Sequence, residues 1–514
     1  MTTVADLAGA VLGPLDRLAA ALVDPSRRER TAVRLLIGYV AVWTLYGVLA
    51  KGSQDVHFDM GEAVAWSREP AFGYSKHPPL SAWVVRAWFT IFPPADWAYY
   101  LLAMVLAGLA LWIAWILSAR WLEGEKRAAG LALLTLVPFF NFHALKFNAN
   151  TVLIPLWAAT TLWFLRSFET RDLLSAALAG VAAAAAMLGK YWSIVLLGGL
   201  AIAALGDARR SGYFRSPAPW VTVAAGALAL APHLAWLLTH HFEPFDYAAA
   251  LHTTGSLWAA AMADVKFIVG AMAYVAVPLI LAFISVQPSP AALYDTLWPS
   301  NPQRRLAVMA FWAPMAIAVS VALAAKILIT PLWTMSMFTL LPIVLLSSPL
   351  VGMRRGALPL LFGVAIAVPV LATLAAPAIA YVIHRNGVPH HAQQYRLVAE
   401  AVDRVWRATT TQPMGLVGSD TNLGNGVAFY LSDRPSTLDV LHPSGTPWAN
   451  EARIVRQGIA LVCAVEETDC MNAVAVLASG LSRGKRSEIE LARNYFGVAG
   501  KPERYSIITV PPQF

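Results

Sequence analysis

The sequence predicts a polytopic α-helical membrane protein with a soluble α/β domain at its C-terminal end. Of the 514 residues, 58% are hydrophobic and only 13% are charged, whereas a soluble globular protein carries about 25% charged residues. Apolar runs of roughly 20 residues, enough to cross a bilayer as a helix, recur between residues 31 and 385. The segment 386–514 is polar and predicts the soluble domain.

The first 24 residues carry apolar side chains at helical spacing. They lack the basic start and apolar core of a cleavable signal peptide. We therefore expect an amphipathic helix over 1–24 that lies on the cytoplasmic surface and bends at Pro14. The formal net charge of +8 does not indicate a nucleic acid partner, because the basic residues gather in loops as they do in membrane proteins.

The apolar runs predict about eleven transmembrane helices. They begin near Thr31, Trp97, Ala128, Thr151, Leu173, Tyr191, Pro219, Met262, Leu306, Pro331 and Ala357. Loops at alternate ends are rich in arginine, which marks cytoplasmic loops; these are the loops around residues 120–127, 166–171, 209–215, 304–305 and 354–355. With the N-terminus inside, the loop 51–95 and everything after His384 face outward.

Six lysines do not follow this charge rule. They lie at predicted outer ends of helices or in outer loops: Lys51, Lys76, Lys146, Lys190, Lys266 and Lys326. A single lysine at such a place is explained by a side chain that reaches for the membrane surface. The set of six favours an outward-facing pocket for an anionic group such as a phosphate, to which lysine offers a compact charge.

The soluble domain is expected to mix helices and strands. Helical patterns cover 393–406 and 471–479, and strand patterns cover 415–418, 426–431, 458–465 and 505–510. The two cysteines of the chain, Cys463 and Cys470, have a spacing that is compatible with a disulfide in an oxidising compartment. The spacing alone does not prove the bond, and further ligands for a zinc site are not evident nearby.

The loop 51–95 holds the densest group of titratable residues in the first half of the chain. Asp59 directly precedes an expected helix, 60–68, so it is either the cap of that helix or a reactive carboxylate. Glu62 lies three residues later and therefore near Asp59 on one helical face. It either contacts a substrate or faces solvent.

The segment DMGEAVAWSREPAFGYSKHPPLSAWVVRAW, residues 59–88, resembles the first outer loop of membrane glycosyltransferases of the GT-C type. These enzymes use polyprenyl-phosphate sugars and include protein O-mannosyltransferases and the aminoarabinose transferase that acts on lipid A. The likeness extends more loosely to the topology, the surface helix and the outer C-terminal domain. It implies a GT-C-like catalytic membrane domain over 1–385 and a periplasmic domain over 386–514.

The resemblance also implies a reaction. A monosaccharide passes, with inversion, from a polyprenyl-phosphate sugar to a hydroxyl of an envelope lipid, glycan or protein, at the outer face of the inner membrane. Such a transfer needs a base for the acceptor proton, and Asp59 matches the acidic residue that opens the loop in the family. Met60 stands where relatives usually have Glu. The resemblance implies no nucleotide cofactor and leaves a divalent metal open.

Other residues take roles by the same resemblance. Lys76 and His77 match the basic element before proline that contacts the carrier phosphate, and a charge-assisted contact there stabilises the departing group. Lys190 corresponds to a lysine beside the donor phosphate, and Lys326 belongs to a later outer loop of similar role. Glu62 stands where the aminoarabinose branch has a basic residue, which weakens the expectation of that substrate.

The remaining expected contacts are to substrate. Trp333 shares the outer loop with Lys326, and Lys146 lies in a loop that reaches the same pocket. Relatives often carry an acidic residue in that loop; this chain has Asn148 and Asn150 instead, of which Asn150 is expected to contact sugar hydroxyls. His57 precedes the helix of Asp59 and adds a ligand. The segment 240–252 is expected to line the acceptor side, since its spacing fits no standard zinc pattern.

Two other classes of function were weighed. A secondary transporter or lipid flippase tends to place ionisable residues near the bilayer midplane and to have repeated halves, whereas the charges here gather at outer helix ends and no repeat is found. A scaffolding protein would not need a lysine-lined pocket beside a carboxylate. The sequence favours a glycosyltransferase and leaves both the sugar and the acceptor open.

Overall fold

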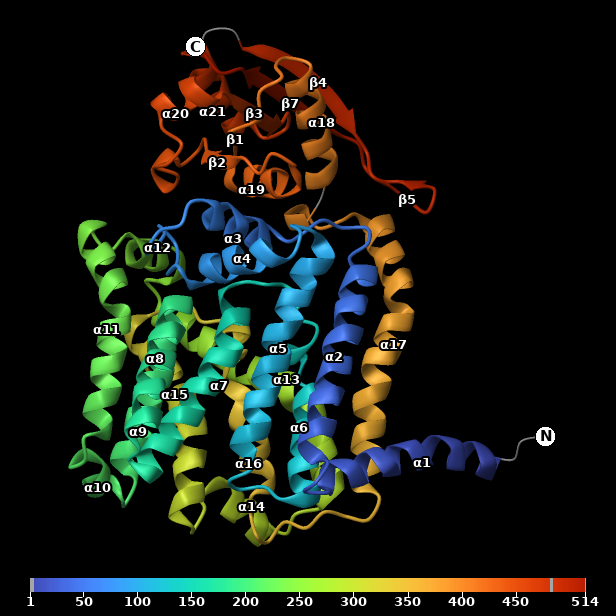
Figure 1. The fold of residues 1–514 in the computed structure, drawn as a ribbon, viewed down its shortest axis with the longest axis vertical. Coiled ribbons are helices and arrows are strands. Elements are labelled where there is room, and N and C mark those ends of the chain that lie inside the picture. Colours follow the sequence, from blue (N-terminus) through green and yellow to red (C-terminus); the bar gives the residue numbers. More distant parts are fainter. Residues whose placement is uncertain (1–3, 393, 481–483, 514) are drawn as a thin grey trace.

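The computed structural model describes residues 4–392, 394–480 and 484–513. Long helices run side by side and form a bundle, and the residues after 394 form a separate layer over one end of it (Figure 1). Helix α1 (Val4–Val23) runs across the other end of the bundle and contains Pro14. The expected N-terminal helix is therefore present over the described residues, and residues 1–3 of it lie outside them.

Seven helices of the described residues are long and apolar enough to cross a membrane. They are α2 (Arg28–Ala50), α5 (Asp96–Ser118), α7 (Ala149–Thr170), α11 (Ala218–Thr239), α13 (Leu257–Val286), α15 (Pro302–Ala325) and α17 (Ala357–Asn386). The chain is thus a multi-span membrane protein. The other predicted runs form shorter helices: α6 (Gly124–Thr135), α8 (Leu173–Gly189) and η2 (Tyr191–Ser193) with α9 (Ile194–Gly206). The count of eleven crossings stays a prediction.

The predicted run from Pro331 is broken rather than continuous. It forms two 3₁₀ turns, η3 (Pro331–Thr334) and η4 (Met337–Leu340), and then the short helix α16 (Leu341–Leu346). Pro331 and Pro342 both occupy first-turn positions of these elements. Proline lacks the N–H that would continue a preceding helix, so the run is divided at these residues.

Small residues bring the long helices together. A Cβ atom on Gly180 of α8 would collide with the carbonyl oxygen of Thr222 on α11. The Thr222 hydroxyl also donates a hydrogen bond of 3.0 Å to the Ala176 carbonyl of α8. Close backbone approach at glycine, supported by hydroxyl hydrogen bonds, is typical of helix packing in membranes. This packing holds α8 and α11 close together.

A thin layer of shorter helices covers the end of the bundle that faces the C-terminal layer (Figure 1). It contains α3 (Phe58–Arg68), α4 (Leu80–Ile91) and α12 (Glu243–His252). Short elements elsewhere are η1 (Pro138–Phe140), α10 (Arg210–Phe214) and α14 (Pro290–Leu297). The predicted loop 51–95 therefore forms two helices that lie between the bundle and the C-terminal layer.

The C-terminal layer contains a five-stranded sheet in the order β2-β1-β3-β7-β4. β1 (Leu416–Ser419) is parallel to β2 (Ser436–Asp439) and β3 (Ile459–Ala464), whereas β7 (Glu503–Val510) is antiparallel to β3 and β4 (Lys485–Leu491). A small hairpin, β5 (Asn494–Tyr495) with β6 (Val498–Ala499), follows β4. The associated helical elements are η5 (His390–Ala392), α18 (Tyr395–Arg407), α19 (Thr421–Tyr430), η6 (Pro443–Gly445), α20 (Glu451–Gln457) and α21 (Thr468–Ser479).

Alternate residues of the sheet strands face two apolar clusters. Val417 and Val462 pack with α18 and α19 on one face, whereas Leu416 and Leu461 pack with α20 and α21 on the other. The alternation follows from the two-residue period of a strand. Cys463 of β3 and Cys470 of α21 form a disulfide, which ties that second face together.

One strand prediction is wrong. Residues 426–431 lie in α19 and at its end rather than in a strand. The Asp420 side chain accepts hydrogen bonds from the backbone N–H groups of Asn422 and Leu423, which starts a helix there. The apolar run is continuous because this helix is buried between the sheet and α3. Strands are present at the other three expected places, as β1, β3 and β7.

Candidate active site

The start of α3 sets the position of Asp59. His57 is the N-cap, and its Nδ1 accepts a hydrogen bond of 3.1 Å from the Asp59 backbone N–H. Asp59 therefore lies in the first turn, where a carboxylate is favoured by the helix dipole. The alternative explanation of Asp59 as the cap of this helix is wrong, so its carboxylate is available for contacts outside the helix.

Those contacts come from the loop that precedes α7. Asp59 Oδ2 lies 3.0 Å from Lys146 Nζ and accepts a hydrogen bond of 3.1 Å from Asn148 Nδ2. Asn148 is itself held in place, because its Oδ1 accepts the N–H groups of Asn150 and Thr151 and caps α7. From the sequence, Asn148 was expected only as a replacement for an acidic residue. Its position directly before the helix α7 could have identified Asn148 as a helix cap.

The electrostatics keep Asp59 charged. Burial raises the pKa of Asp59, but Lys146, His57 and the hydrogen bond from Asn148 lower it by more, so the pKa lies below its usual value. Burial lowers the pKa of His57 to about 3 against the opposing effect of Asp59. At neutral pH the pair is therefore an ionised carboxylate beside a neutral imidazole.

A cavity of about 220 Å³ lies beside Asp59, at the start of α7 and the end of α8. Lys190, in the turn between α8 and η2, lines it and lies 2.9 Å from Asn150 Oδ1 and 4.7 Å from the centre of the Trp333 ring. Burial lowers the pKa of Lys190 to about 8, partly opposed by Asp59. Lys190 remains mostly charged at neutral pH and supplies positive charge to this cavity.

His77 also lines the cavity, although as a neutral side chain. Burial lowers its pKa to about 4, and the nearby Lys190 lowers it further against the effect of Asp59. His77 can thus donate or accept a hydrogen bond there but carries no charge at neutral pH. His252, from the segment 240–252, is a further lining residue; the expectation that this segment lines the acceptor side stays a prediction.

Lys76 is not among the residues that line this cavity. Its Nζ is 2.7 Å from Glu62 Oε1. Burial raises the pKa of Glu62 even against Lys76, and the pKa of Lys76 is raised because Glu62 outweighs its own burial. Glu62 lines the small cavity and a larger one next to it, whereas Lys76 lines the larger one.

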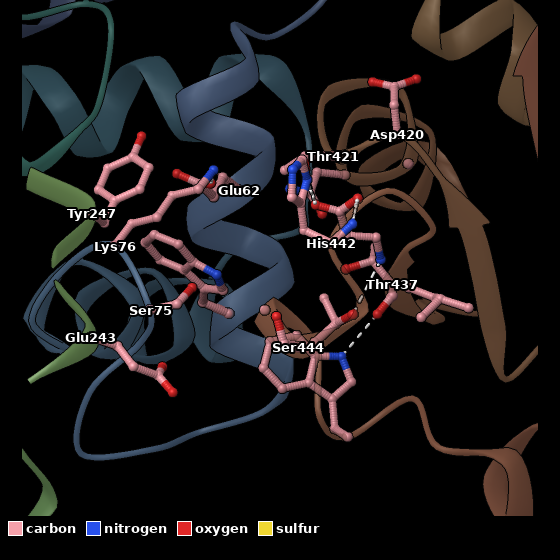
Figure 2. A pocket seen from close by; sticks show the side chains of 18 of the residues that line it. Glu62, Ser75, Lys76, Glu243, Tyr247, Asp420, Thr421, Thr437, His442 and Ser444 are labelled. Atoms are coloured by element: carbon pink, nitrogen blue, oxygen red, sulfur yellow. Dashed lines mark hydrogen bonds and ion pairs between the residues drawn. The ribbon is translucent and has the colours of Figure 1, made fainter. Parts of the chain in front are cut away.

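The larger cavity, of about 570 Å³, lies between α3, α12 and the C-terminal sheet (Figure 2). Side chains from both parts of the chain line it, among them Trp66, Tyr247, Thr421, Asp439 and Trp448. No residue of its C-terminal wall was predicted from the sequence to belong to a site. One signal was present: polar residues follow the carboxyl ends of two parallel strands, β1 and β2, where ligands bind in open α/β sheets.

The structure brings several predicted site residues together and leaves others apart. Asp59, Glu62, His77, Asn150, Lys190 and Trp333 line the small cavity. Lys146 does not line the cavity but pairs with Asp59, which does. His57 does not line it either; the centre of its ring lies 4.4 Å from that of His391. Lys326 is exposed at the end of α15 and is not among the residues that line either cavity. The predicted roles of all these residues stay predictions.

Buried polar contacts hold the loop of Asp59 against the C-terminal layer. The fully buried Asp55 carboxylate lies 2.5 Å from Arg493 Nη2 and accepts the Arg396 backbone N–H at 3.2 Å. Arg68, at the end of α3, donates to the Ala428 carbonyl at 3.0 Å. Gly61 brings α3 close to α19, because a Cβ atom there would lie 3.2 Å from the backbone of Asn425. Asp59 is thus positioned by the loop before α7 and, through α3, by the C-terminal layer.

A divalent metal was left open by the sequence. Within residues 4–392, 394–480 and 484–513, no group of three or more His, Cys, Asp or Glu side chains is placed to hold a metal ion. The positive charges near Asp59 come from lysines, Lys146 and Lys190.

The chain is similar to known proteins over part of its length. Residues 76–236 match the family described as Dolichyl-phosphate-mannose-protein mannosyltransferase. A stretch of 235 residues is 27% identical to the lipopolysaccharide core galacturonosyltransferase RgtB of Rhizobium johnstonii; it covers 45% of this chain and 46% of that relative. The match thus spans less than half of the relative's length.

The fold has matches among solved structures. The structure of ArnT from Cupriavidus metallidurans bound to undecaprenyl phosphate has a TM-score of 0.62 at 13% identity, and the match covers 92% of this chain and 97% of that one. The apo form of the same protein gives 0.60 at 14% identity with the same coverage. These likenesses confirm the resemblance seen over residues 59–88: the chain is a multi-span membrane protein with the GT-C fold, similar to the glycosyltransferases of that class.

Proposed function

We propose that the protein transfers a monosaccharide from a polyprenyl-phosphate sugar to a hydroxyl group of an envelope lipid, glycan or protein. The observation that carries this proposal is the arrangement of the small cavity. An ionised carboxylate, Asp59, and a charged lysine, Lys190, line one cavity at the outer ends of the long helices. A base and a phosphate ligand are the two groups that this reaction needs.

Lys190 binds the donor phosphate in this proposal. Its ammonium group is fixed by Asn150 and by the face of Trp333, so little side-chain entropy is lost when an anion binds. The site lies where the tail of a polyprenyl lipid can remain in the bilayer while its phosphate enters the cavity. The solved relative that shares the fold was captured with undecaprenyl phosphate, which supports this class of donor.

Asp59 acts as the general base. The acceptor oxygen forms a bond to the anomeric carbon as the bond from that carbon to the phosphate oxygen breaks, and the configuration inverts. The phosphate leaves with the bonding electrons and is stabilised by Lys190, while the acceptor proton passes to Asp59. Lys146 and Asn148 hold the carboxylate in one orientation, and such positioning lowers the barrier.

The proposal extends to the arrangement in the membrane. Residues 1–385 form a catalytic domain of eleven spans, residues 386–514 form an outer domain, and both the active site and the outer domain face the periplasm across the inner membrane. Three observations support this orientation. The Asp59 cavity is at the end of the bundle that the C-terminal layer covers, α1 is at the other end, and Cys463 and Cys470 form a disulfide, which persists in oxidising compartments.

The first test compares Asp59→Asn with the wild type. Purified full-length protein is supplied with a panel of undecaprenyl-phosphate sugars and envelope acceptors. Loss of a general base costs about 100-fold or more in rate, so transfer should fall by at least that factor while donor binding is retained. Glu400→Gln, an exposed change on α18, serves as the control and should leave transfer unchanged.

Two outcomes would contradict the proposal in different ways. Transfer that survives in Asp59→Asn would remove Asp59 as the base and direct attention to Glu62, which lines the same cavity. Folded wild-type protein that binds none of the donors would overturn the glycosyltransferase function itself and favour the transporter or flippase.

A further inference from the structure

We propose that the larger cavity binds a sugar of the acceptor and selects a neutral or amino sugar over one that carries phosphate or carboxylate. This inference rests on the proposed function, because an acceptor site is meaningful only beside a donor site. It adds a substrate class to that function, since the reaction alone does not say which hydroxyl compound is accepted.

The position of the larger cavity fits an acceptor site. Glu62, Trp66 and Tyr247 line both cavities, so the two spaces meet at these side chains. Glu62 is one turn along α3 from Asp59. A molecule in the larger cavity can therefore extend a hydroxyl past Glu62 towards Asp59 while the donor phosphate lies beside Lys190.

The walls of the larger cavity have the chemistry that recognises sugars. Trp66, Tyr247 and Trp448 supply flat apolar faces, which suit the C–H faces of a sugar ring while their polar atoms bond elsewhere. Trp448 is fixed, because its Nε1 donates a hydrogen bond of 2.9 Å to the Thr437 carbonyl. A volume of about 570 Å³ lies within the range of small-molecule sites, roughly 300–1,000 Å³, and is large enough for a monosaccharide and part of its neighbour.

The charge of the cavity is predominantly negative. Its lining contains five carboxylates, Glu62, Glu243, Asp246, Asp420 and Asp439, against the basic side chains Lys76 and His442. Lys76 Nζ lies 2.7 Å from Glu62 Oε1, so the positive charge of Lys76 is balanced by this ion pair. Glu243 and Asp246 are exposed on α12, and neither has an ion-pair partner among the described residues.

These charges favour one class of ligand. An ionised carboxylate only accepts hydrogen bonds, so it binds sugar hydroxyls and, more strongly, the ammonium group of an amino sugar. A phosphate or carboxylate on the ligand would meet like charge, and the lysine of this cavity is already neutralised by Glu62. The small cavity differs in this respect, since Lys190 pairs with an amide oxygen rather than a carboxylate.

Deeper in the cavity, Asp439 presents an ordered polar surface. Its Oδ1 accepts the backbone N–H groups of Leu441 and His442 at 3.0 and 3.1 Å, and its Oδ2 is bonded to the Thr421 hydroxyl. Asp439 is therefore held by the loop after β2 and orients Thr421 and His442 at the wall that Figure 2 shows. These two side chains come from the C-terminal layer, which gives that layer a role in acceptor choice.

The test measures binding separately from transfer. Full-length protein in nanodiscs is mixed with the methyl glycoside of a neutral hexose, with its 2-amino-2-deoxy analogue or with its 6-phosphate, and saturation-transfer NMR records each complex. We expect the neutral and amino glycosides to bind and the phosphate to bind at least tenfold more weakly. The double substitution Glu243→Lys and Asp246→Lys should strengthen binding of the phosphate and weaken that of the amino sugar. Glu490→Lys, an exposed change on β4, should alter neither.

Three outcomes of this test would overturn the inference. Binding of the 6-phosphate that equals or exceeds that of the neutral glycoside would overturn it, as would binding that the double substitution does not change or the absence of binding by all three glycosides. The inference and the proposed function fail separately. Transfer that depends on Asp59 without the expected sugar preference would overturn only the inference. Sugar binding with the expected preference, in a protein that binds no polyprenyl-phosphate sugar, would overturn only the glycosyltransferase function.

Discussion

The small and the large cavity share a wall but differ in origin and charge. The small one is lined by side chains of the membrane part alone and combines Asp59 with Lys190. The large one is closed by the C-terminal layer and is lined mainly by carboxylates among its charged groups. The comparison teaches that the proposed donor and acceptor sites differ in charge balance, although Glu62 and Trp66 of α3 line both. The small cavity places Lys190 beside Asp59 and Glu62, whereas the large cavity has five carboxylates against Lys76 and His442.

The contact between the C-terminal layer and the loop of Asp59 should have the largest effect when broken, because both cavities depend on it. Asp55→Asn leaves Arg493 without its carboxylate partner at 2.5 Å. Removal of one member of a buried ion pair costs about 3 kcal/mol or more, so we expect a loss of that size in the free energy of unfolding. Urea titration of the protein in detergent measures it.

A matched control for this change is Glu488→Gln. Its ion pair with Arg486 is more than half exposed on both sides, and exposed pairs contribute about 0–1 kcal/mol. Equal losses from Asp55→Asn and Glu488→Gln would contradict the importance of the buried contact.

The donor side should depend on Lys190. Lys190→Met removes the charge from the small cavity, and loss of a charge-assisted hydrogen bond costs about 1.5–3 kcal/mol. We therefore expect kcat/KM for the polyprenyl-phosphate sugar to fall by about 100-fold, and Lys190→Arg to restore part of it. Lys326→Met tests the predicted donor role of that exposed lysine at the same end of the bundle. A change in kcat/KM of less than about twofold, as for an exposed charge, would remove Lys326 from the donor site. A large effect there would extend the donor site to the loop after α15.

The wall between the cavities should respond to Glu62→Gln. Because Glu62 faces both spaces and pairs with Lys76, its loss should lower kcat/KM for the acceptor by about tenfold, the value of one hydrogen bond to a charged group. The KM for the donor should stay the same. Lys76→Met provides the matched change on the other partner, and a rise in donor KM in Glu62→Gln would assign Glu62 to the donor side instead.

The dependence of donor kcat/KM on pH separates the two candidate bases. The pKa of Asp59 is lowered below 3.8, so this carboxylate stays ionised as the pH falls through the ordinary range and no acid limb is expected above about pH 5. The pKa of Lys190 is lowered to about 8, so its charge is lost and the rate falls as the pH rises through that value. An acid limb above 4.5 would indicate Glu62, whose pKa is raised from that value. Lys190→Arg should remove the alkaline limb.

Much of the architecture could be predicted from local patterns. Run length and apolar composition identified the membrane helices, and the density of titratable residues identified the loop that carries Asp59. The break at Pro331 and the helix in place of a strand at 426–431 could not be read in this way. In both cases local chemistry, a proline or an aspartate cap, was overlooked because the apolar content of the run suggested a longer or different element.

The site was predicted in parts. The sequence alone determined that the protein spans a membrane and that Asp59, Glu62 and Lys76 lie together on one loop between membrane helices, because hydropathy and neighbouring positions are local properties. Only the tertiary structure brought Asn148 and Lys190 to Asp59, separated Lys76 from the small cavity and closed the larger one with the C-terminal layer. The physical reason is that these contacts join segments tens to hundreds of residues apart. Their positions follow from close helix packing at residues such as Gly180 and Gly61, which no local pattern of a single sequence reports.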